Sequence, residues 1–338
     1  MRPRVPDPTV LILTQPIDMT ADRVIKRMYD RGVSVVRFDT GWFPRDATVV
    51  TRYSNSSADI PIMIKLESGR SIELDKVTSI WSRRPTRFTM HEDLDSDASK
   101  FATAETTQAM GGIFRIPGCQ WVNHPDKDLV ASYKPYQLAL AARIGLKIPD
   151  TLITSDRSAA KMFIEAHARH GAIYKTLSTP NVRSELYKSS VIFTSRISDA
   201  DLEFIDTVRY APCLIQEYVQ KSFEVRLTII NRKAFAVALN VQESYPSGTT
   251  DWRAVQQEGI EYSVHQLPEK IESLCLELLD QLGLVFGAID LIVTPEQEYI
   301  FVEVNPSGQW AWLESAVGLP MTDTLIDCLI NPSLRANR

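Results

Sequence analysis

The sequence predicts a protein of mixed α/β and α+β architecture with more than one domain. A chain of 338 residues is long for a single domain and has room for two or three. Its N-terminal segment follows a strand–helix–strand pattern, which is typical of a parallel sheet. Near the C-terminus, two strand-like segments are separated only by a short turn, which predicts an antiparallel hairpin.

Composition limits the classes of function. The chain is 44% hydrophobic and 23% charged, which is ordinary for a globular protein, and its net charge is −5. An acidic chain offers no general basic face to nucleic acid. The polar, proline-rich start MRPRVPDPT does not fit a signal peptide, and no apolar run approaches the length of a membrane span. We therefore expect a soluble, cytoplasmic protein that binds neither nucleic acid nor membranes.

Cysteine usage agrees with a reducing compartment. The four cysteines are Cys119, Cys213, Cys275 and Cys328. They are scattered along the chain without a CxxC pair. This spacing favours buried thiols over a disulfide or zinc framework.

The first domain is expected to end near Trp121 to Asn123. Its predicted strands lie at 9–13, 33–38, 60–66 and 70–74, and its predicted helices at 21–31 and within 91–110. Thr20 is expected to cap the first helix. Arg83 and Arg84 form a basic pair at a strand end, for which a solvated turn and a contact with an anion are both open.

The middle of the chain contains two lysines in positions that suit an anion. Pro135 fits the first turn of a helix over 135–144, so Lys134 stands at a helix N-terminus. Lys175 ends a predicted strand over 171–175, where a solvated cation is the simpler interpretation. The following polar segment, 177–185, contains no glycine, so any mobility must come from its small polar residues.

The C-terminal half is rich in predicted strands. Strands are expected at 191–194, 213–219, 221–230 and 233–241, helices at 199–209, 268–282 and 313–331, and a polar loop or short strand at 251–262. Within 221–230 the period of two places Glu224, Arg226 and Thr228 on one face. The 268–282 helix carries Leu274, Leu278 and Leu282 on its apolar stripe.

The hairpin over 287–305 gathers oxygen donors. Glu303 and Asn305 lie two residues apart on one strand, so their side chains emerge on the same face. Asp290 lies beside them if the two strands pair. Solvated polar positions are the simple alternative, but Glu303 lies between Val302 and Val304, where an unsatisfied carboxylate is costly. Two carboxylates and an amide oxygen suit Mg²⁺.

The order of these residues predicts a site for a magnesium nucleotide. Two lysines can neutralise a polyphosphate, the strand edge at Tyr218 and Val219 can offer backbone groups to a purine, and a carboxylate at Glu224 can accept a ribose hydroxyl. The sequence contains neither a GxxxxGK phosphate loop nor the HRD and DFG motifs of protein kinases.

With these motifs the sequence resembles the ATP-grasp superfamily, and within it the maturases of ribosomally made peptides, the graspetide or microviridin-type synthetases. The resemblance runs from about Val10 to Leu329. It rests on FDTGWFP, SIWSRRP, WVNHP, YKPYQLALAARIGLKIPDTLITSD, IQEYV, EVRLTII and FGAIDLIV…YIFVEVNPSGQWAWLE. The NPSGQWxWxE run is the most specific of these.

The resemblance implies a fold and a set of roles. It implies a preATP-grasp domain over 1–122, a central lid domain over 123–212 and a C-terminal ATP-grasp domain over 213–338, assembled as a homodimer. The implied ATP site consists of Lys134 and Lys175 on the phosphates, Gln216, Glu217, Tyr218 and Val219 around adenine, Glu224 on the ribose, and Asp290, Glu303 and Asn305 as ligands of Mg²⁺.

The resemblance also implies a reaction. A side-chain carboxylate of a precursor peptide attacks ATP to give an acyl phosphate and ADP, and a Ser, Thr or Lys side chain of the same peptide then displaces phosphate. Arg226 is expected to bind the γ-phosphate or the acyl phosphate, with a structural salt bridge to Glu224 as the alternative. Arg83 and Arg84 are expected to face the acidic core peptide.

Two other functions stay open at this point. A RimK-like ligase, which adds amino acids to a carboxylate, would use the same nucleotide site. A catalytically silent ATP-binding module that recognises a leader peptide is a third possibility, although such a module has no need of the metal ligands.

Overall fold

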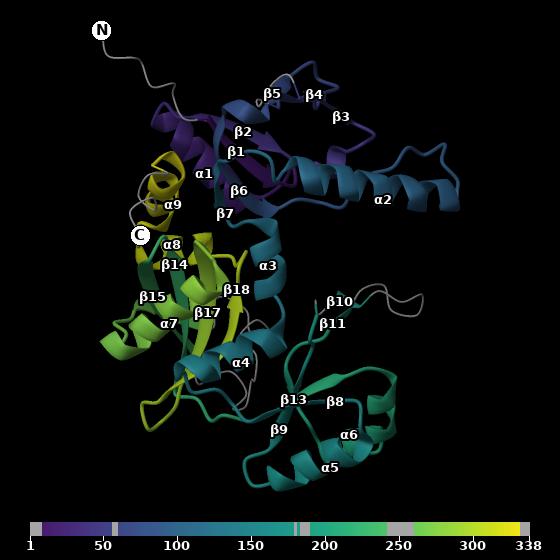
Figure 1. Ribbon diagram of the computed structural model, residues 1–338. Helices are drawn as coiled ribbons and strands as arrows, with labels where there is room; N and C mark the ends of the chain where they lie inside the picture. The colour runs from purple at the N-terminus through teal and green to yellow at the C-terminus, as the bar shows by residue number, and fades with distance from the viewer. Residues whose placement is uncertain (1–8, 56–59, 179–180, 183–189, 242–259, 332–338) are drawn as a thin grey trace.

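A computed structural model of the chain describes residues 9–55, 60–178, 181–182, 190–241 and 260–331. Figure 1 shows three bodies, each built around its own β-sheet: an N-terminal body at the top, a C-terminal body below it, and a central body at the lower right. The predicted mixed architecture is confirmed. None of the helices in the described ranges combines the length and the apolar composition needed to cross a bilayer.

The N-terminal sheet is parallel, with strand order β2-β1-β6-β7. Its elements are β1 (Thr9–Thr14), α1 (Met19–Asp30), β2 (Ser34–Phe38), β6 (Val77–Arg84) and β7 (Gln120–Val122). The predicted strand–helix–strand unit is therefore confirmed. The predicted cap is wrong: Asp18, not Thr20, accepts from the first backbone N–H groups of α1. Thr20 lies inside the first turn of α1, and its own backbone N–H donates to the Asp18 carboxylate.

A second small sheet and a long helix complete the N-terminal body. Its elements are η1 (Thr40–Trp42), β3 (Ala47–Thr51), β4 (Ile62–Leu66), β5 (Ser71–Glu73), η2 (Leu74–Lys76) and α2 (Ser96–Ile113). The predicted hairpin at 60–74 is confirmed as the antiparallel pair β4 and β5, with Gly69 at φ +81° in its turn. The helix predicted within 91–110 begins at Ser96, after the cap Asp95, and projects from the body (Figure 1).

The central sheet is antiparallel, with order β12-β9-β13-β8. Its body contains β8 (Thr151–Thr154), α5 (Arg157–Ala166), β9 (Ala172–Lys175), β10 (Asn181–Val182), β11 (Ser190–Val191), β12 (Ser195–Arg196), α6 (Asp199–Leu202), η3 (Ile205–Tyr210) and β13 (Cys213–Glu217). The predicted 191–194 strand is wrong, since β11 ends at Val191 and pairs with β10. The predicted 199–209 helix breaks at Glu203 into α6 and η3. Of the polar segment 177–185, residues 179–180 and 183–185 lie outside the described residues.

The C-terminal sheet is antiparallel, with order β16-β15-β14-β17-β18. Its body contains β14 (Phe223–Ile230), β15 (Lys233–Val241), β16 (Ile260–Val264), α7 (Glu269–Leu282), β17 (Phe286–Val293), β18 (Tyr299–Asn305), α8 (Ala311–Val317) and α9 (Met321–Ile330). The helix predicted over 313–331 is two helices, because Gly318 at φ +73° ends α8 and Pro320 precedes α9. Most of the predicted 251–262 segment lies outside the described residues.

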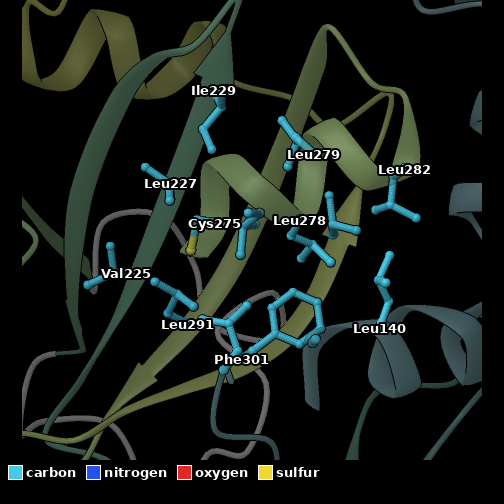
Figure 2. Packing of buried hydrophobic residues seen from close by; sticks show 14 of the residues in the cluster. Leu140, Val225, Leu227, Ile229, Cys275, Leu278, Leu279, Leu282, Leu291 and Phe301 are labelled. Carbon is cyan, nitrogen blue, oxygen red and sulfur yellow. The ribbon is translucent and has the colours of Figure 1, made fainter. Parts of the chain in front are cut away.

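The main core lies between this sheet and α7, as Figure 2 shows. Leu278 and Leu282 are buried as predicted, and Leu274 packs at the edge of the cluster. Helices α3 (Pro125–Ala131) and α4 (Lys134–Ile144) precede the central sheet in sequence, yet they contribute Ala131 and Leu140 to this same core.

The strands that pair in the central sheet indicate a different domain boundary from the one expected at 212/213. Strand β13 pairs with β8 and β9, so the central sheet continues past residue 212. Helix α4 packs on β18 of the C-terminal sheet. We therefore propose that the expected boundary at 212/213 moves beyond Glu217 and that α3 and α4 belong with the C-terminal body.

Asn123 joins the N-terminal body to the C-terminal sheet. Its Nδ2 donates to the carbonyls of Phe286 (2.8 Å) and Pro306 (2.9 Å), and its Oδ1 accepts from the backbone N–H groups of Val285 (2.7 Å) and Phe286 (2.9 Å). The side chain is buried, and three of the four bonds are buried while the bond to Pro306 is part-buried. One residue therefore satisfies four backbone groups at the start of β17 and just after β18.

We expect Asn123→Ala to destabilise the fold strongly. The substitution leaves buried donors and acceptors unpaired, and each such group costs about 1–3 kcal/mol, so a loss of about 3 kcal/mol or more is expected. Urea unfolding measures it. Asn331→Ala is the matched control, because the exposed Asn331 amide donates only to the Asp327 carbonyl at the end of α9. Equal losses in the two variants would contradict the role of Asn123.

Candidate active site

The predicted oxygen-donor hairpin is confirmed. Strands β17 and β18 pair antiparallel, with Asp290 directly opposite Glu303 and Asn305 two residues further on. The register shifts immediately after Asp290, which marks a bulge at Val302. Bulges of this kind re-aim side chains next to functional sites. Glu303 is only 5% exposed, so its carboxylate needs partners.

Cationic side chains contact both carboxylates. Lys134 Nζ donates to Glu303 Oε2 (2.6 Å), and Arg226 Nη1 donates to Asp290 Oδ1 (2.7 Å). Asn305 Nδ2 donates to the other Glu303 oxygen (3.2 Å). The donor set is compact: the three predicted metal ligands and two predicted phosphate-binding cations lie on one side of the C-terminal sheet.

The alternative partner given for Arg226, a salt bridge to Glu224, is wrong. Its salt bridge is to Asp290 and not to Glu224, because Arg226 lies opposite Asp290 in the β14/β17 register. Glu224 instead accepts from Lys221, three residues earlier in the chain. Both pairs are largely shielded from water, with side-chain exposures of 8% and 15% for Arg226 and Asp290. Arg226 is therefore held directly beside the predicted metal site.

The predicted nucleotide residues line two adjoining cavities. The first is lined by Ile173, Lys175, Gln216, Glu217, Tyr218, Val219, Lys221, Glu224, Asp290, Glu303 and neighbouring side chains. The second, of about 610 Å³, is lined by Ser132, Tyr133, Lys134, Lys175, Thr176, Asn305 and others. The two share Lys175, Thr194 and Glu303. The structure thus brings together every residue expected to bind ATP.

The side chains of Gln216 and Glu217 also support the local backbone. Gln216 is buried, and its Nε2 donates to Thr151 Oγ1 (2.8 Å). Glu217 accepts from the backbone N–H of Asp150 (2.9 Å). Tyr218 and Val219 follow the end of β13. The backbone N–H of Tyr218 donates to the carbonyl of Gly171 (2.8 Å), so this group is not available to a ligand.

A third cavity adjoins the other two at the hairpin. It has a volume of about 550 Å³ and is lined by Arg84, Asp128, Ser132, Arg226, Asp290, the 305–309 segment and Trp312. It shares Asp290 with the first cavity and Ser132 and Asn305 with the second. We call it the acceptor cavity, because none of the residues expected around adenine lines it.

The expectation for Arg83 is wrong in this structure. Arg83 is buried, and its guanidinium donates to the carbonyls of Ser307 and Gly308 and lies 3.6 Å from Asp18 Oδ2. Burial lowers the pKa of Arg83 to about 10. Arg83 therefore positions the segment after β18. Only Arg84 of the pair lines the acceptor cavity.

Several residues of the site carry no recognisable signal in the sequence. Gln137 of α4 exchanges two hydrogen bonds with the backbone of Val304 (2.9 and 3.0 Å), which fixes β18 beside Glu303. Asp128 of α3 enters the acceptor cavity, and burial raises its pKa to about 6. An acid in a first helical turn is common, so nothing in the pattern separates Asp128 from Asp126.

The donor set at the hairpin fits Mg²⁺. The predicted donors at the hairpin are the carboxylates of Asp290 and Glu303 and the amide of Asn305. In the described ranges no group of three His, Cys, Asp or Glu side chains forms a larger metal centre. The protein would thus supply only a few of the oxygen ligands of the metal. Mg²⁺ suits such a site because waters and phosphate oxygens usually complete its coordination shell. Glu303 also lies beside Lys134, and Asp290 beside Arg226, which suits a site that receives phosphate groups.

Family models place the chain. A model of the MvdD pre-ATP grasp domain matches residues 9–128, and a model of the RimK-like ATP-grasp domain matches residues 131–329, more than half of the chain. Fold and site thus define an ADP-forming ligase rather than a silent nucleotide-binding module. The chain belongs to the ATP-grasp superfamily, with an MvdD-type N-terminal domain and a RimK-like ATP-grasp domain.

Solved structures agree over nearly the whole chain. The macrocyclase MdnC from Microcystis aeruginosa, bound with precursor peptide MdnA, is 29% identical with a TM-score of 0.83, covering 96% of this chain and 99% of that one. A RiPP-associated ATP-grasp ligase from Chryseobacterium gregarium, with ADP and a leader and core peptide, is 26% identical with a TM-score of 0.86, covering 96% and 97%. The resemblance to peptide maturases is therefore confirmed.

A more distant relative comes from the curated proteins. The alpha-aminoadipate–LysW ligase LysX of Sulfurisphaera tokodaii is 24% identical over 202 residues, which is 57% of this chain. The match spans 65% of that protein's length.

Proposed function

We propose that this ligase uses ATP to phosphorylate Asp or Glu side chains of a ribosomally made precursor peptide and then closes ester links to Ser or Thr or amide links to Lys. The observation that carries the proposal is the meeting of the two nucleotide cavities with the acceptor cavity at Asp290 and Asn305. Similarity to MdnC, whose structure contains a precursor peptide, supports a peptide as the acceptor.

The nucleotide roles follow from the cavity lining. Lys134 and Lys175 neutralise the phosphates, Gln216 to Val219 surround adenine, and Glu224 accepts a ribose hydroxyl. Asp290, Glu303 and Asn305 hold Mg²⁺, which supplies charge neutralisation at the phosphates when it is bound. The salt bridge between Lys134 and Glu303 supports a role for Lys134 at the phosphate end of the nucleotide.

The reaction proceeds in two displacements. A carboxylate oxygen of the peptide attacks the γ-phosphorus, and the bond to ADP breaks. The resulting acyl phosphate is then attacked at carbon by a hydroxyl or amine, and phosphate leaves. Lys175 steadies the transferred phosphoryl group from the nucleotide side, while Arg226 faces the same hairpin from the acceptor cavity. The contribution of the protein is position and charge.

We expect Arg226→Ala to reduce turnover far more than nucleotide binding. Arg226 lines the acceptor cavity and not the adenine cavity, so its loss removes a positive charge that faces the transferred phosphoryl group. A loss of about 10²–10³-fold in kcat is expected from removal of one charge-stabilising group. ADP release and nucleotide titration measure the two effects. Equal losses in both would argue against this role.

The mass of the precursor peptide before and after reaction gives a direct test of the function. The protein is incubated with ATP, Mg²⁺ and a candidate precursor that has an acidic, Thr-rich C-terminus. Loss of one water per link, accompanied by ADP, is expected. An unchanged peptide, with ADP formed only when free amino acids are supplied, would instead favour a RimK-like ligase, the alternative that the similarity to LysX supports. We further propose that the protein is a cytoplasmic homodimer and that it acts without nucleic acid or membranes. Sedimentation of the purified protein tests the dimer.

A further inference from the structure

Asp128 is the one carboxylate of the acceptor cavity that makes no salt bridge among the described residues. It lies on α3, and its Oδ2 accepts from Ser307 Oγ (3.0 Å). Its Oδ1 is buried and has no hydrogen-bond partner in the described part of the chain. Asp290, the other acid of this cavity, is bound by Arg226. Asp128 is thus the acid of this cavity whose carboxylate is bound by no cation among the described residues.

The second displacement requires a proton acceptor. A Ser or Thr hydroxyl must lose a proton as it attacks the acyl carbon, and a Lys ammonium must lose one before its nitrogen can attack. The leaving phosphate is bound by cations and is a weak base in that setting. A carboxylate that lines the acceptor cavity can take this proton from the incoming nucleophile.

We propose that Asp128 is the general base of ring closure, an inference that rests on the proposed peptide ligase function. A hydroxyl gives its proton to Asp128 while its oxygen forms a bond to the acyl carbon, whereas an ammonium gives a proton to Asp128 first and its nitrogen then forms the bond. The carbon–oxygen bond to phosphate breaks, phosphate leaves, and Asp128 passes the proton to solvent. No oxidant, reductant or further reactant is consumed.

The surroundings of Asp128 suit this task. Burial raises the pKa of its carboxyl to about 6, and a hydrogen bond from Ser307 and the nearby Asn123 amide oppose that rise only in part. The charged groups that line the same cavity are Arg84, Arg226 and Asp290. A base whose pKa lies near the working pH is both ionised and able to hold a proton.

The test separates the two displacements. Hydroxylamine is neutral near physiological pH and attacks acyl phosphates without a base, so it traps the first intermediate as a hydroxamate. Asp128→Asn is expected to keep hydroxamate formation with precursor, ATP and Mg²⁺ close to wild type, while ring closure falls about 10²–10⁴-fold. Asp126→Asn is the matched control, because Asp126 lies on the same helix, half exposed, and pairs with Arg115. It should change neither rate.

The pH profile gives a second readout. A base works only when it is deprotonated, so wild-type ring closure should fall as the pH drops through about 6, and this acid limb should be missing in Asp128→Asn. Because the folded-state pKa is raised above the usual 3.8, charging Asp128 opposes folding at higher pH. The variant should therefore melt no lower than wild type at neutral pH, whereas a structural role predicts a lower Tm.

The outcomes are distinct. Absence of hydroxamate with the wild-type protein would overturn the proposed function itself. Hydroxamate with wild type, together with normal ring closure in both Asp128→Asn and Asp128→Ser, would overturn only the role of Asp128. Equal loss of hydroxamate and ring closure in both variants would mean that Asp128 acts in the first displacement or in folding, and would also overturn the proposal.

Discussion

Glu303→Gln is expected to reduce ADP formation by about 10³-fold while leaving the protein folded. Glu303 is buried in β18, and its carboxylate accepts from both Lys134 and Asn305. Glutamine keeps the shape of the side chain but removes the negative charge. The predicted metal ligand is lost, and the Lys134 ammonium loses its carboxylate partner. Steady-state ADP release, with a melting curve for the folded state, measures both expectations.

The matched control for this substitution is Glu298→Gln. Glu298 lies in the turn of the same hairpin, and its carboxylate pairs with Lys147, with both side chains about half exposed. Exposed pairs contribute at most about 1 kcal/mol, so activity and stability should stay near wild type. A second measurement is the dependence of nucleotide binding on Mg²⁺, which Glu303→Gln should weaken. If that dependence and the rate of ADP release both stay unchanged, Glu303 does not hold the metal.

The hairpin could be predicted from the sequence because all its determinants are local. Strong apolar alternation, a turn at residues 295–298 and two strands adjacent in the chain together fix both the pairing and the face of Asp290 and Glu303. The position of Lys134 at a helix N-terminus could also be predicted, because Pro135 and Gly145 mark the two ends of α4. Local chemistry sufficed for these positions.

The remaining site residues depend on contacts between distant segments. Arg226 and Asp290 are 64 residues apart and meet only because β14 pairs with β17. Arg83 is 224 residues from Ser307, so its burial follows from how two bodies pack. No pattern within a strand distinguishes a buried arginine that binds carbonyls from an exposed one that binds an anion. Asp128 was also missed, because its contact with Ser307 joins segments that are 179 residues apart.

Gly308→Ala is expected to reduce turnover by about 10²-fold, a loss typical of a displacement of about 1 Å in an active site. A Cβ at this position would lie 2.6 Å from Ala288 Cβ, 2.7 Å from Arg226 Nη2 and 3.3 Å from Asn305 Cβ. Ala288 is fixed in β17, so Arg226 and the 305–308 segment must move. The overpacking should also cost about 1–3 kcal/mol of stability.

Gly112→Ala provides the control for Gly308. Gly112 lies in α2, and a Cβ added there meets no atom within 4 Å. Alanine is the better helix former, so this variant should be stabilised by up to about 1 kcal/mol with unchanged turnover. The close approach of Ala288, Arg226 and Asn305 is the physical reason that the NPSGQW motif carries glycine at 308. Wild-type turnover in Gly308→Ala, with the same stability, would show that the positions of Arg226 and Asn305 do not limit the reaction.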